Sequence, residues 1–442
     1  MLHRTFGDAA MEAVWSETAT VDGWLRTEAA LSLAQGIVGD LDPAWAAAIA
    51  GACTLDSIDI PALWDGMANV GYPILGLVRQ IAARLPDGPD RAVHYGATTQ
   101  DIMDTGLALQ LAATLDRLDA LVDGLGDAFA AQAEVHAGTV MAGRTHGQQA
   151  VPTTLGAKLA IFLRQTLRLR ADLAAVRGEV CVVSLYGAAG SSAGFGPRAG
   201  RVREETARSL GLGAGDGPRH AARDGLAAYG AVCARAAALC TRLAREVIDL
   251  SRTEIGEIGE ASGHHRGASS TMPQKANPID SESTLGMAVT TATLAGALYR
   301  AMEVSQERAA GEWQIEWHVL PQLSCLTAGA LMIAARIVTA LAVHPDRMTA
   351  NLAAEQGRTL AEAYMFELAP ALGRERAHDV VYDAAVRSKA DSVDLRTALI
   401  MVAGLRDEEL RTLEPGDWIG DSLAQTVAAV EAWRAARSAG MG

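Results

Sequence analysis

The chain has few aromatic residues and no excess of basic ones. Only 5% of its 442 residues are Phe, Trp or Tyr, although 50% are hydrophobic. Lys and Arg number 38 against 52 Asp and Glu, so the formal net charge is −14. A general nucleic-acid binder needs a basic face, and we therefore expect no nucleic-acid partner. A dianionic substrate remains possible, because a few local Arg and Lys side chains can override the net field.

Cysteine is also scarce, and no pair has the Cys-x-x-Cys spacing. The five cysteines are Cys53, Cys181, Cys233, Cys240 and Cys325. We expect all five to be reduced residues of the core, as in a cytosolic protein. The first ten residues carry charges and no apolar run, so no signal peptide is expected and the predicted location is cytoplasmic.

Signals for a cofactor, a metal or a membrane span are weak or missing. Residues 187–200 are rich in glycine, but they lack the strand–turn–helix context of a nucleotide fold. His264 and His265 are adjacent and cannot readily face one ion, and no Cys or carboxylate stands at metal spacing. The uncharged stretches 283–299 and 317–335 are marginal in length for a span and suit buried helices of a large bundle. We expect no cofactor, no metal site and no membrane insertion.

What the chain does contain is a set of long helical patterns. Alanine and leucine dominate its apolar residues, which suits close-packed helices better than sheets. Apolar residues recur at helical spacing, with few breakers, in residues 101–137, 153–180, 221–257, 280–308 and 318–342. We predict an all-α fold with a five-helix central bundle. The predicted domains are an N-terminal helical domain over 1–98, the bundle over 99–345, and a small helical domain over 346–442. Such helices have more apolar surface than one chain covers, so oligomerisation is expected.

The segment 267–280 carries the strongest functional signal. Small and hydroxyl residues come first, and Lys275 and Asn277 follow just before Pro278. This order suits a flap that lays a hydroxyl, an ammonium and an amide over one anion. A helix that starts after Pro278 would add backbone N–H donors. Chemistry that builds negative charge beside a carboxylate needs such an arrangement.

Segment 267–280 resembles the signature loop of the fumarase/aspartase superfamily, which includes adenylosuccinate lyase, argininosuccinate lyase and 3-carboxy-cis,cis-muconate cycloisomerase. The usual opening Gly-Ser is Ala268-Ser269 here. Residues 143–158, which contain Arg-Thr-His-Gly-Gln, resemble the family's Thr-His region. Residues 94–105, which contain Ala-Thr-Thr-Gln-Asp, resemble the region whose hydroxyls bind a substrate carboxylate. The resemblance covers most of the chain.

The resemblance implies a β-elimination or its reverse. A base removes a proton from the carbon next to a carboxylate, giving an aci-carboxylate dianion, and a leaving group departs from the neighbouring carbon. By resemblance Ser269 is the base, and Lys275 and Asn277 hold the carboxylate that becomes the dianion. His146 is a general acid or a binding residue, and Glu282 is its partner, which would fix the tautomer of the imidazole.

Further residues are expected to bind substrate. Thr98, Thr99 and Gln100 would form a second carboxylate cradle at a helix start, where plain N-capping is the other interpretation. The remaining candidates by position are Thr145, Gln148, Ser270 and Arg308, with Arg144 as another plausible anion contact. The family's members are homotetramers whose active sites combine segments from three subunits, so a homotetramer acting on a small dicarboxylate or tricarboxylate is implied.

The resemblance leaves the substrate open. His146 stands where bacterial cycloisomerases tend to have an aromatic residue, which favours a lyase that releases fumarate from a substituted succinate with an amine, hydrazine or nitrite leaving group. The segment 313–317 and the Met-Pro-Gln-Lys form of the loop favour the alternative, lactonisation of 3-carboxy-cis,cis-muconate. Adenylosuccinate lyase is less favoured, because residues 69–79 lack its His-Asp. A crystallin-like structural role is disfavoured because Ser269 and Lys275 are retained.

Overall fold

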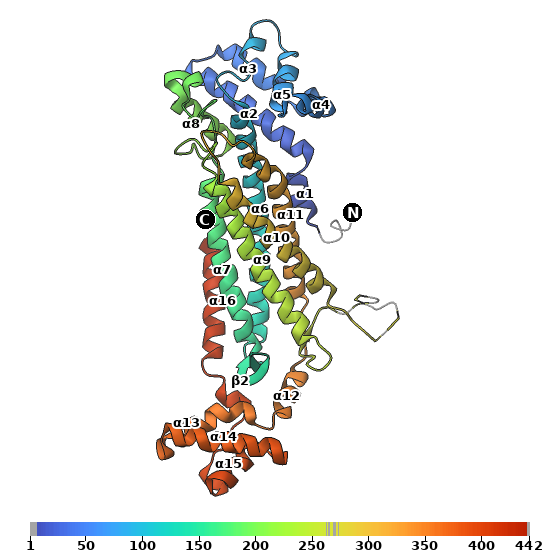
Figure 1. The fold of residues 1–442 in the computed structure, drawn as a ribbon, viewed down its shortest axis with the longest axis vertical. Coiled ribbons are helices and arrows are strands. Elements are labelled where there is room, and N and C mark those ends of the chain that lie inside the picture. The colour runs from blue at the N-terminus through green and yellow to red at the C-terminus, as the bar shows by residue number, and fades with distance from the viewer. Residues whose placement is uncertain (1–6, 262, 264–265, 268–270, 273, 440–442) are drawn as a thin grey trace. The chain divides into compact units, whose positions relative to one another are not determined.

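The computed structural model describes residues 7–439 except 262, 264–265, 268–270 and 273. It confirms the all-α fold (Figure 1). Within the described ranges, strands are limited to two short antiparallel pairs. The first helices are α1 (Ala9–Val14), α2 (Glu17–Val38), α3 (Pro43–Ala52), α4 (Ile60–Val70) and α5 (Ile74–Ala82). The last are α12 (Pro345–Ala354), α13 (Ala361–Leu372), α14 (Arg374–Asp391), α15 (Leu395–Ala403) and α16 (Ser422–Ala439).

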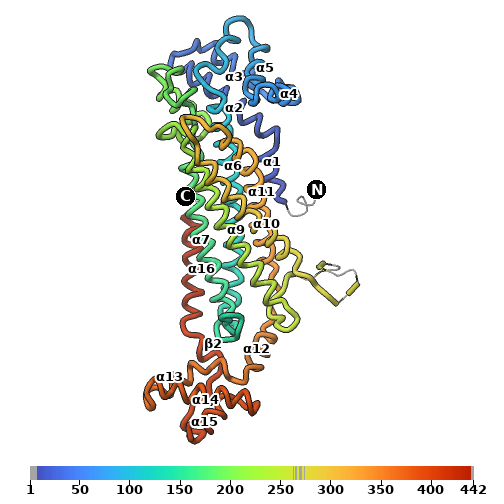
Figure 2. The backbone as a smooth tube through the Cα atoms, viewed as in Figure 1, coloured from blue at the N-terminus to red at the C-terminus, as the bar shows by residue number. Residues whose placement is uncertain are grey.

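Five long helices lie where the sequence predicts them, with shifted ends. They are α6 (Thr99–Val135), α7 (Leu155–Val180), α9 (Asp224–Leu250), α10 (Ile279–Ala301) and α11 (Glu312–Thr339), with the shorter α8 (Ala199–Leu210) between α7 and α9. The predicted limits 280–308 and 318–342 are wrong by several residues, because α10 stops at Ala301 and α11 starts at Glu312. The segment 313–317 therefore lies in the first two turns of α11. Figure 2 traces the same path as a tube from blue to red.

The described chain divides into two compact units, each drawn from three stretches of sequence. Unit 1 comprises residues 1–122, 169–238 and 286–332, and unit 2 comprises residues 123–168, 239–285 and 333–442. The five long helices contribute residues to both units. The division of the sequence into 1–98, 99–345 and 346–442 stays a prediction.

Unit 1 is held by close helix contacts. The Tyr229 hydroxyl on α9 lies 2.6 Å from the Ser324 hydroxyl on α11, and both side chains are fully buried. A Cβ on Gly230 of α9 would lie 2.7 Å from Leu298 of α10. A second apolar cluster packs α2 to α5 with α8, around residues such as Leu31 and Leu77. Small residues thus let the helices approach closely.

Unit 2 has helix contacts of its own. Phe129 of α6 and Phe162 of α7 stack with ring centroids 5.3 Å apart. Arg242 of α9 donates to Gln165 of α7 at 2.5 Å. Trp433 of α16 donates to Asp127 of α6 at 2.7 Å, and its ring fills the space that a Cβ on Gly126 would need. The C-terminal helix thus packs on α6, a contact that the sequence did not suggest.

One glycine contact in unit 2 gives a testable prediction. A Cβ on Gly156 of α7 would lie 2.5 Å from the Ala137 Cα and 2.8 Å from the Ala133 oxygen, both backbone atoms. Gly156→Ala is therefore expected to destabilise the fold by about 1–3 kcal/mol, because backbone cannot yield to the added methyl. The matched control is Gly178→Ala in the same helix, where nothing lies within 4 Å of the new Cβ. That change should be neutral or stabilising by about 0.5–1 kcal/mol. Urea unfolding checks both variants, and equal effects would contradict the prediction.

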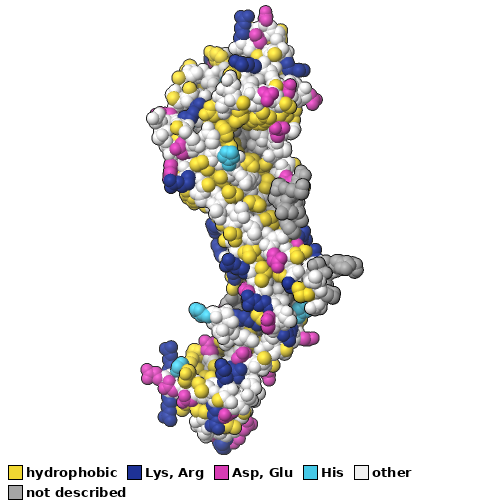
Figure 3. All heavy atoms as spheres, turned by 45° about the vertical axis from the view of Figure 1, so that its right-hand side comes forward, with side chains coloured by type: hydrophobic (Ala, Val, Ile, Leu, Met, Phe, Trp, Pro, Cys, Tyr) yellow, Lys and Arg dark blue, Asp and Glu magenta, His cyan; other side chains and the backbone are white. Residues whose placement is uncertain are grey.

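Hydrophobic side chains remain on the surface of the single chain, and Figure 3 shows some of them in yellow on one face. They include Val289 and Tyr299 on α10 and Met302 just after it, with exposed fractions of 49%, 52% and 39%. Two helices, α9 and α11, are long and apolar enough to cross a membrane by composition alone, but 61% of each apolar window is buried inside the protein. Such mostly buried helices are typical of a bundle core.

Candidate active site

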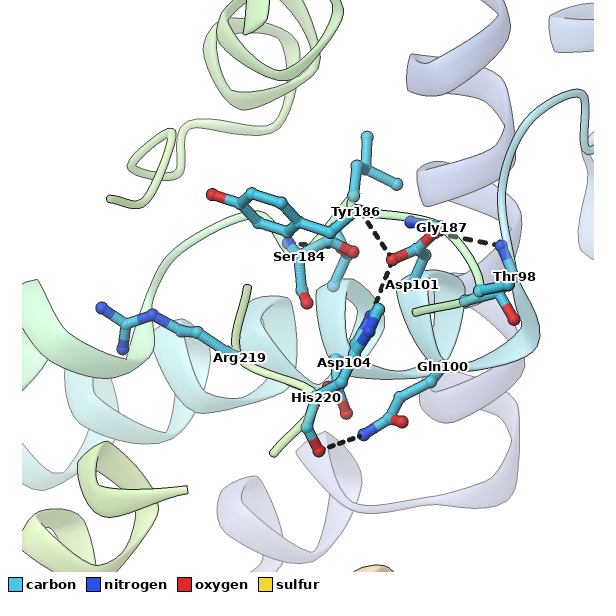
Figure 4. A network of polar contacts seen from close by, with 12 residues as sticks. Thr98, Gln100, Asp101, Asp104, Ser184, Tyr186, Gly187, Arg219 and His220 are labelled. Atoms are coloured by element: carbon cyan, nitrogen blue, oxygen red, sulfur yellow. Dashed lines mark hydrogen bonds and ion pairs between the residues drawn. The ribbon is translucent and has the colours of Figure 1, made fainter. Parts of the chain in front are cut away.

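The start of α6 forms a compact polar site in unit 1 (Figure 4). Asp101 lies in the first turn of α6, fully buried, and its Oδ2 accepts the backbone N–H of Thr98 at 3.0 Å. A carboxylate three residues into a helix that binds the N–H of the residue before it is half of a capping box. Thr98 and Thr99 are partly exposed, while Gln100 is buried and donates to the His220 carbonyl at 3.1 Å. Thr98 and Thr99 therefore stand at the helix N-terminus without being fully buried.

Arg308 joins this site from a distant part of the sequence. Its guanidinium donates to the Thr98 hydroxyl at 3.2 Å and to the Ala188 carbonyl at 3.0 Å. The structure thus brings together two predicted substrate-binding residues that stand 210 positions apart. A guanidinium, two hydroxyls and a helix N-terminus together suit a carboxylate.

The Thr-His segment is a β-hairpin, which the sequence analysis missed. Strand β1 (Val140–Thr145) pairs with β2 (Gln148–Thr154), and Thr145 faces Gln148 at the last pair. His146 and Gly147 form the turn, with φ of 51° and 76°. Two positive φ values are typical of a type I′ turn. Thr145, His146, Gly147 and Gln148 are all exposed, so the hairpin projects its predicted site residues into solvent.

Arg144 forms an ion pair within the chain. Its guanidinium makes two hydrogen bonds, of 2.8 and 2.6 Å, to the carboxylate of Glu257, which is fully buried. Asn351 donates to the same carboxylate at 2.8 Å. Arg144 is therefore occupied with anchoring β1, and the expected anion contact stays a prediction.

The structure describes the base of the signature loop. Ser269 and Ser270 lie outside the described residues. Gly267 has φ of 66°, and its carbonyl accepts both the backbone N–H of Asn277 at 2.9 Å and the Asn277 side-chain amide at 3.0 Å. These bonds close the loop at its base. Lys275 is exposed within it, so its ammonium is accessible to a ligand.

The start of α10 differs from the expectation in one respect. The backbone N–H groups of Asp280 and Ser281 donate to Glu260 at 3.1 and 2.6 Å. These two donors are satisfied within the protein and are not free for a substrate anion. Asp280 is buried and paired with Arg336 at 2.6 Å and with Arg266. The predicted helix start is confirmed, but its first donors stabilise the chain.

The predicted pair of His146 and Glu282 is not formed within one chain. Both side chains are exposed, and within the part of the chain that the structure describes no hydrogen bond joins them. The pairing stays a prediction for an assembly in which the two residues come from different subunits.

Sequence reasoning missed a buried ion network next to the start of α6. Arg223 bonds Asp104 of α6 at 2.7 Å and Glu316 of α11 at 2.5 Å, and all three side chains are at most 6% exposed. Burial raises the pKa of Glu316, although Arg223 opposes the shift. Two buried carboxylates thus share one arginine. The only sign of this network in the sequence was Glu316, an acidic residue in a largely apolar helix.

The tryptophan-rich segment forms part of the wall of a cavity in unit 1. Trp313 is buried, stacks on Tyr72 at 5.6 Å, and meets Trp317 edge-on at 5.1 Å. The cavity of about 270 Å³ is also lined by Trp15, Trp24 and Trp64. The segment therefore has a packing role in addition to any contact with substrate.

Comparison with known proteins identifies the family. A family model described as "Lyase" matches residues 17–292. The chain is 38% identical to a 3-carboxy-cis,cis-muconate cycloisomerase of Pseudomonas aeruginosa, covering 95% of this chain and 93% of that protein. It is 31% identical to an N-acetyl-S-(2-succino)cysteine lyase of Enterococcus italicus, covering 98% and 96%. The crystal structure of 3-carboxy-cis,cis-muconate lactonizing enzyme from Pseudomonas putida matches with a TM-score of 0.90 at 36% identity, covering 98% and 99%. With these similarities and the helical fold, the chain belongs to the fumarase/aspartase superfamily of lyases.

Proposed function

We propose that the protein is a cycloisomerase that lactonises 3-carboxy-cis,cis-muconate. The observation that carries this proposal is the 38% identity to the Pseudomonas aeruginosa cycloisomerase along nearly the full length of both chains. It reverses the order of preference that His146 alone suggested. A substituted succinate with a nitrogen leaving group becomes the second candidate.

The reaction needs a nucleophile, an electron acceptor and a proton donor. One carboxylate oxygen of the substrate adds to a double-bond carbon, and the electron pair moves into the neighbouring carboxylate to give an aci-carboxylate. The adjacent carbon then takes a proton from Ser269 in its protonated form. The enzyme's main task is to stabilise the dianion, for which Lys275 and Asn277 are the proposed donors.

The start of α6 is the proposed holder of a second carboxylate. Arg308 contacts Thr98 there in unit 1, Thr99 is the next residue, and the carboxylate of Asp101 is already satisfied by donors of the chain. The positive end of α6 adds to the field at this place. Gln100 is buried and supports the loop at His220, so its proposed role is indirect.

The second candidate rests on the hairpin turn. His146 is exposed at its tip, where an imidazole can reach a substrate bound to another subunit. An imidazole suits the departure of a nitrogen or sulfur group by donating a proton or a hydrogen bond. The similarity to N-acetyl-S-(2-succino)cysteine lyase supports this candidate.

Two measurements distinguish the two candidate functions: which substrate the wild-type protein consumes, and how His146→Asn changes that activity. Wild-type protein should consume 3-carboxy-cis,cis-muconate, followed by ultraviolet absorbance, and release little fumarate from succinyl-cysteine or succinyl-amine adducts. His146→Asn should keep lactonisation within about tenfold of wild type, because the internal carboxylate needs no proton from the imidazole. His378→Asn, a change at an exposed histidine of α14, is the matched control. Fumarate release that exceeds lactonisation and collapses in His146→Asn would establish the second candidate.

We also propose a homotetramer with composite sites, since Ser269, His146 and Thr98 lie on separate segments. Under subunit exchange, inactive Ser269→Ala protein mixed with weakened Arg308→Leu protein should regain up to about a quarter of wild-type activity, because some sites combine intact segments. Light scattering gives the assembly state. A monomer, or no recovery despite proven exchange, would contradict composite sites. The cytoplasmic location stays a prediction.

A further inference from the structure

Asp101 is bound by four N–H donors at the start of α6. Its Oδ1 accepts from the Tyr186 backbone at 2.9 Å and lies 2.8 Å from the His220 Nε2. Its Oδ2 accepts from the backbone of Gly187 at 2.9 Å and of Thr98 at 3.0 Å. Figure 4 shows these groups converging from three parts of the chain. One carboxylate therefore ties two loops to the first turn of a helix.

His220 is as deeply placed as the carboxylate it meets. It is 1% exposed and Asp101 is 0% exposed. Its carbonyl also accepts from the Gln100 amide, so His220 contacts two consecutive residues of α6. Among the described residues the buried His220 Nδ1 has no hydrogen-bond partner, so the ring is fixed through Nε2. Burying a ring nitrogen without a hydrogen bond costs free energy, and this cost points to a role of His220 in holding the site.

The glycine-rich stretch 187–200 begins at Gly187, one of the residues whose backbone N–H groups bind Asp101. Gly187 has φ of 75°, and the next residue, Ala188, accepts from Arg308. Further along, a Cβ on Gly96 would lie 2.8 Å from the Gly194 carbonyl, so the two backbones are in close contact. Thr98 is thus linked to this loop through Arg308, and its backbone N–H is bound by Asp101.

We propose that Asp101 and His220 are positioning residues, which fasten the loops at 184–188 and 219–220 to α6 and so fix the carboxylate cradle of Thr98, Thr99 and Arg308. The inference rests on the proposed function for its substrate. Neither residue needs to touch the substrate. Loss of the clamp would let Thr98 and Ala188 drift, and Arg308 would lose the two partners that orient it.

The test compares two replacements of His220 with a control elsewhere in unit 1. His220→Leu removes the donor to Asp101, whereas His220→Gln keeps an amide N–H at a similar reach. The control is Tyr229→Phe, which removes a buried 2.6 Å hydrogen bond to Ser324 without touching the cradle. If the clamp acts on binding, KM for 3-carboxy-cis,cis-muconate rises at least about tenfold in His220→Leu with kcat within about threefold. His220→Gln should restore KM to within about threefold of wild type, and Tyr229→Phe should leave it unchanged.

A second measurement does not depend on the reaction. Amide hydrogen exchange of Thr98, Tyr186 and Gly187 should become at least about tenfold faster in His220→Leu and should stay unchanged in Tyr229→Phe. Unchanged exchange at these amides, or a KM that responds equally to both variants, overturns the clamp. If the wild type instead acts on succinyl adducts, the proposed function fails, and the same KM comparison on that substrate still decides the clamp.

Discussion

Replacing Ser269 by alanine is expected to lower kcat by at least about a thousandfold and to leave KM nearly unchanged. In the lactonising direction Ser269 is the proposed proton donor, and its alkoxide is the base of the reverse reaction, so its loss removes the group that exchanges the proton with the substrate carbon. A serine hydroxyl is a very weak acid, so the proposal requires that its pKa be lowered by the positive charge of Lys275 and by hydrogen bonds to its alkoxide form. Steady-state kinetics on carboxymuconate measures the effect.

The matched control for Ser269→Ala is Ser251→Ala at the end of α9, where the hydroxyl donates to the carbonyl of Ile248 at 3.1 Å. That change should leave kcat within about twofold, because it touches only a local backbone bond. Ser269→Ala protein that retains turnover within tenfold of wild type would show that another group is the base. Binding of substrate to the inactive variant, followed by calorimetry, would separate loss of chemistry from loss of folding.

The helices could be predicted because their signal is local. Each of the five long helices carries its own apolar periodicity, so α6 and α7 lie within a few residues of the expected limits. The hairpin at 140–154 was missed because strands of six and seven residues beside a helical pattern give little periodicity of their own. The turn depends on the positive φ of His146, and no pattern of side chains in the sequence predicts that a histidine adopts this conformation.

The sequence suggested candidate site residues one by one, but not how they are arranged. Motif order identified Thr98 and Arg308 separately, whereas their contact depends on how α6 and the segment before α11 fold together. Arg144 shows the opposite case. Its place beside the Thr-His motif suggested an anion contact, whereas its guanidinium pairs with the buried carboxylate of Glu257, which is remote in sequence. Asp101 and His220 were passed over because an aspartate in a helix start and a lone histidine are common in any sequence.

Replacing Arg223 by leucine is expected to destabilise the fold by about 3–5 kcal/mol, because it leaves two buried carboxylates without their partner. Arg223 uses its guanidinium to bond Asp104 of α6, Glu316 of α11 and the Arg219 carbonyl. Burial lowers the pKa of Arg223, but the two carboxylates raise it by more, so the arginine stays charged in the wild type. Urea unfolding measures the loss.

The matched control is Arg177→Leu, because Arg177 also pairs with two carboxylates but does so at the surface. It lies 2.8 Å from Asp116 and 3.0 Å from Asp119, whose side chains are 72% and 36% exposed. Exposed ion pairs contribute about 0–1 kcal/mol, so this variant should unfold close to the wild type. Equal losses in the two variants would contradict a special role for the buried network.

The pH dependence of Arg223→Leu gives an independent check of the same network. Burial already raises the pKa of Glu316 above its ordinary value, and without Arg223 the shift must grow. The folded state then binds more protons than the unfolded state between the two pKa values, so the stability of the variant falls as pH rises through that window. Urea midpoints should therefore be closer to the wild type at pH 5 than at pH 8. A gap between variant and wild type that is equal at both values would mean that Asp104 and Glu316 find water or another partner when Arg223 is gone.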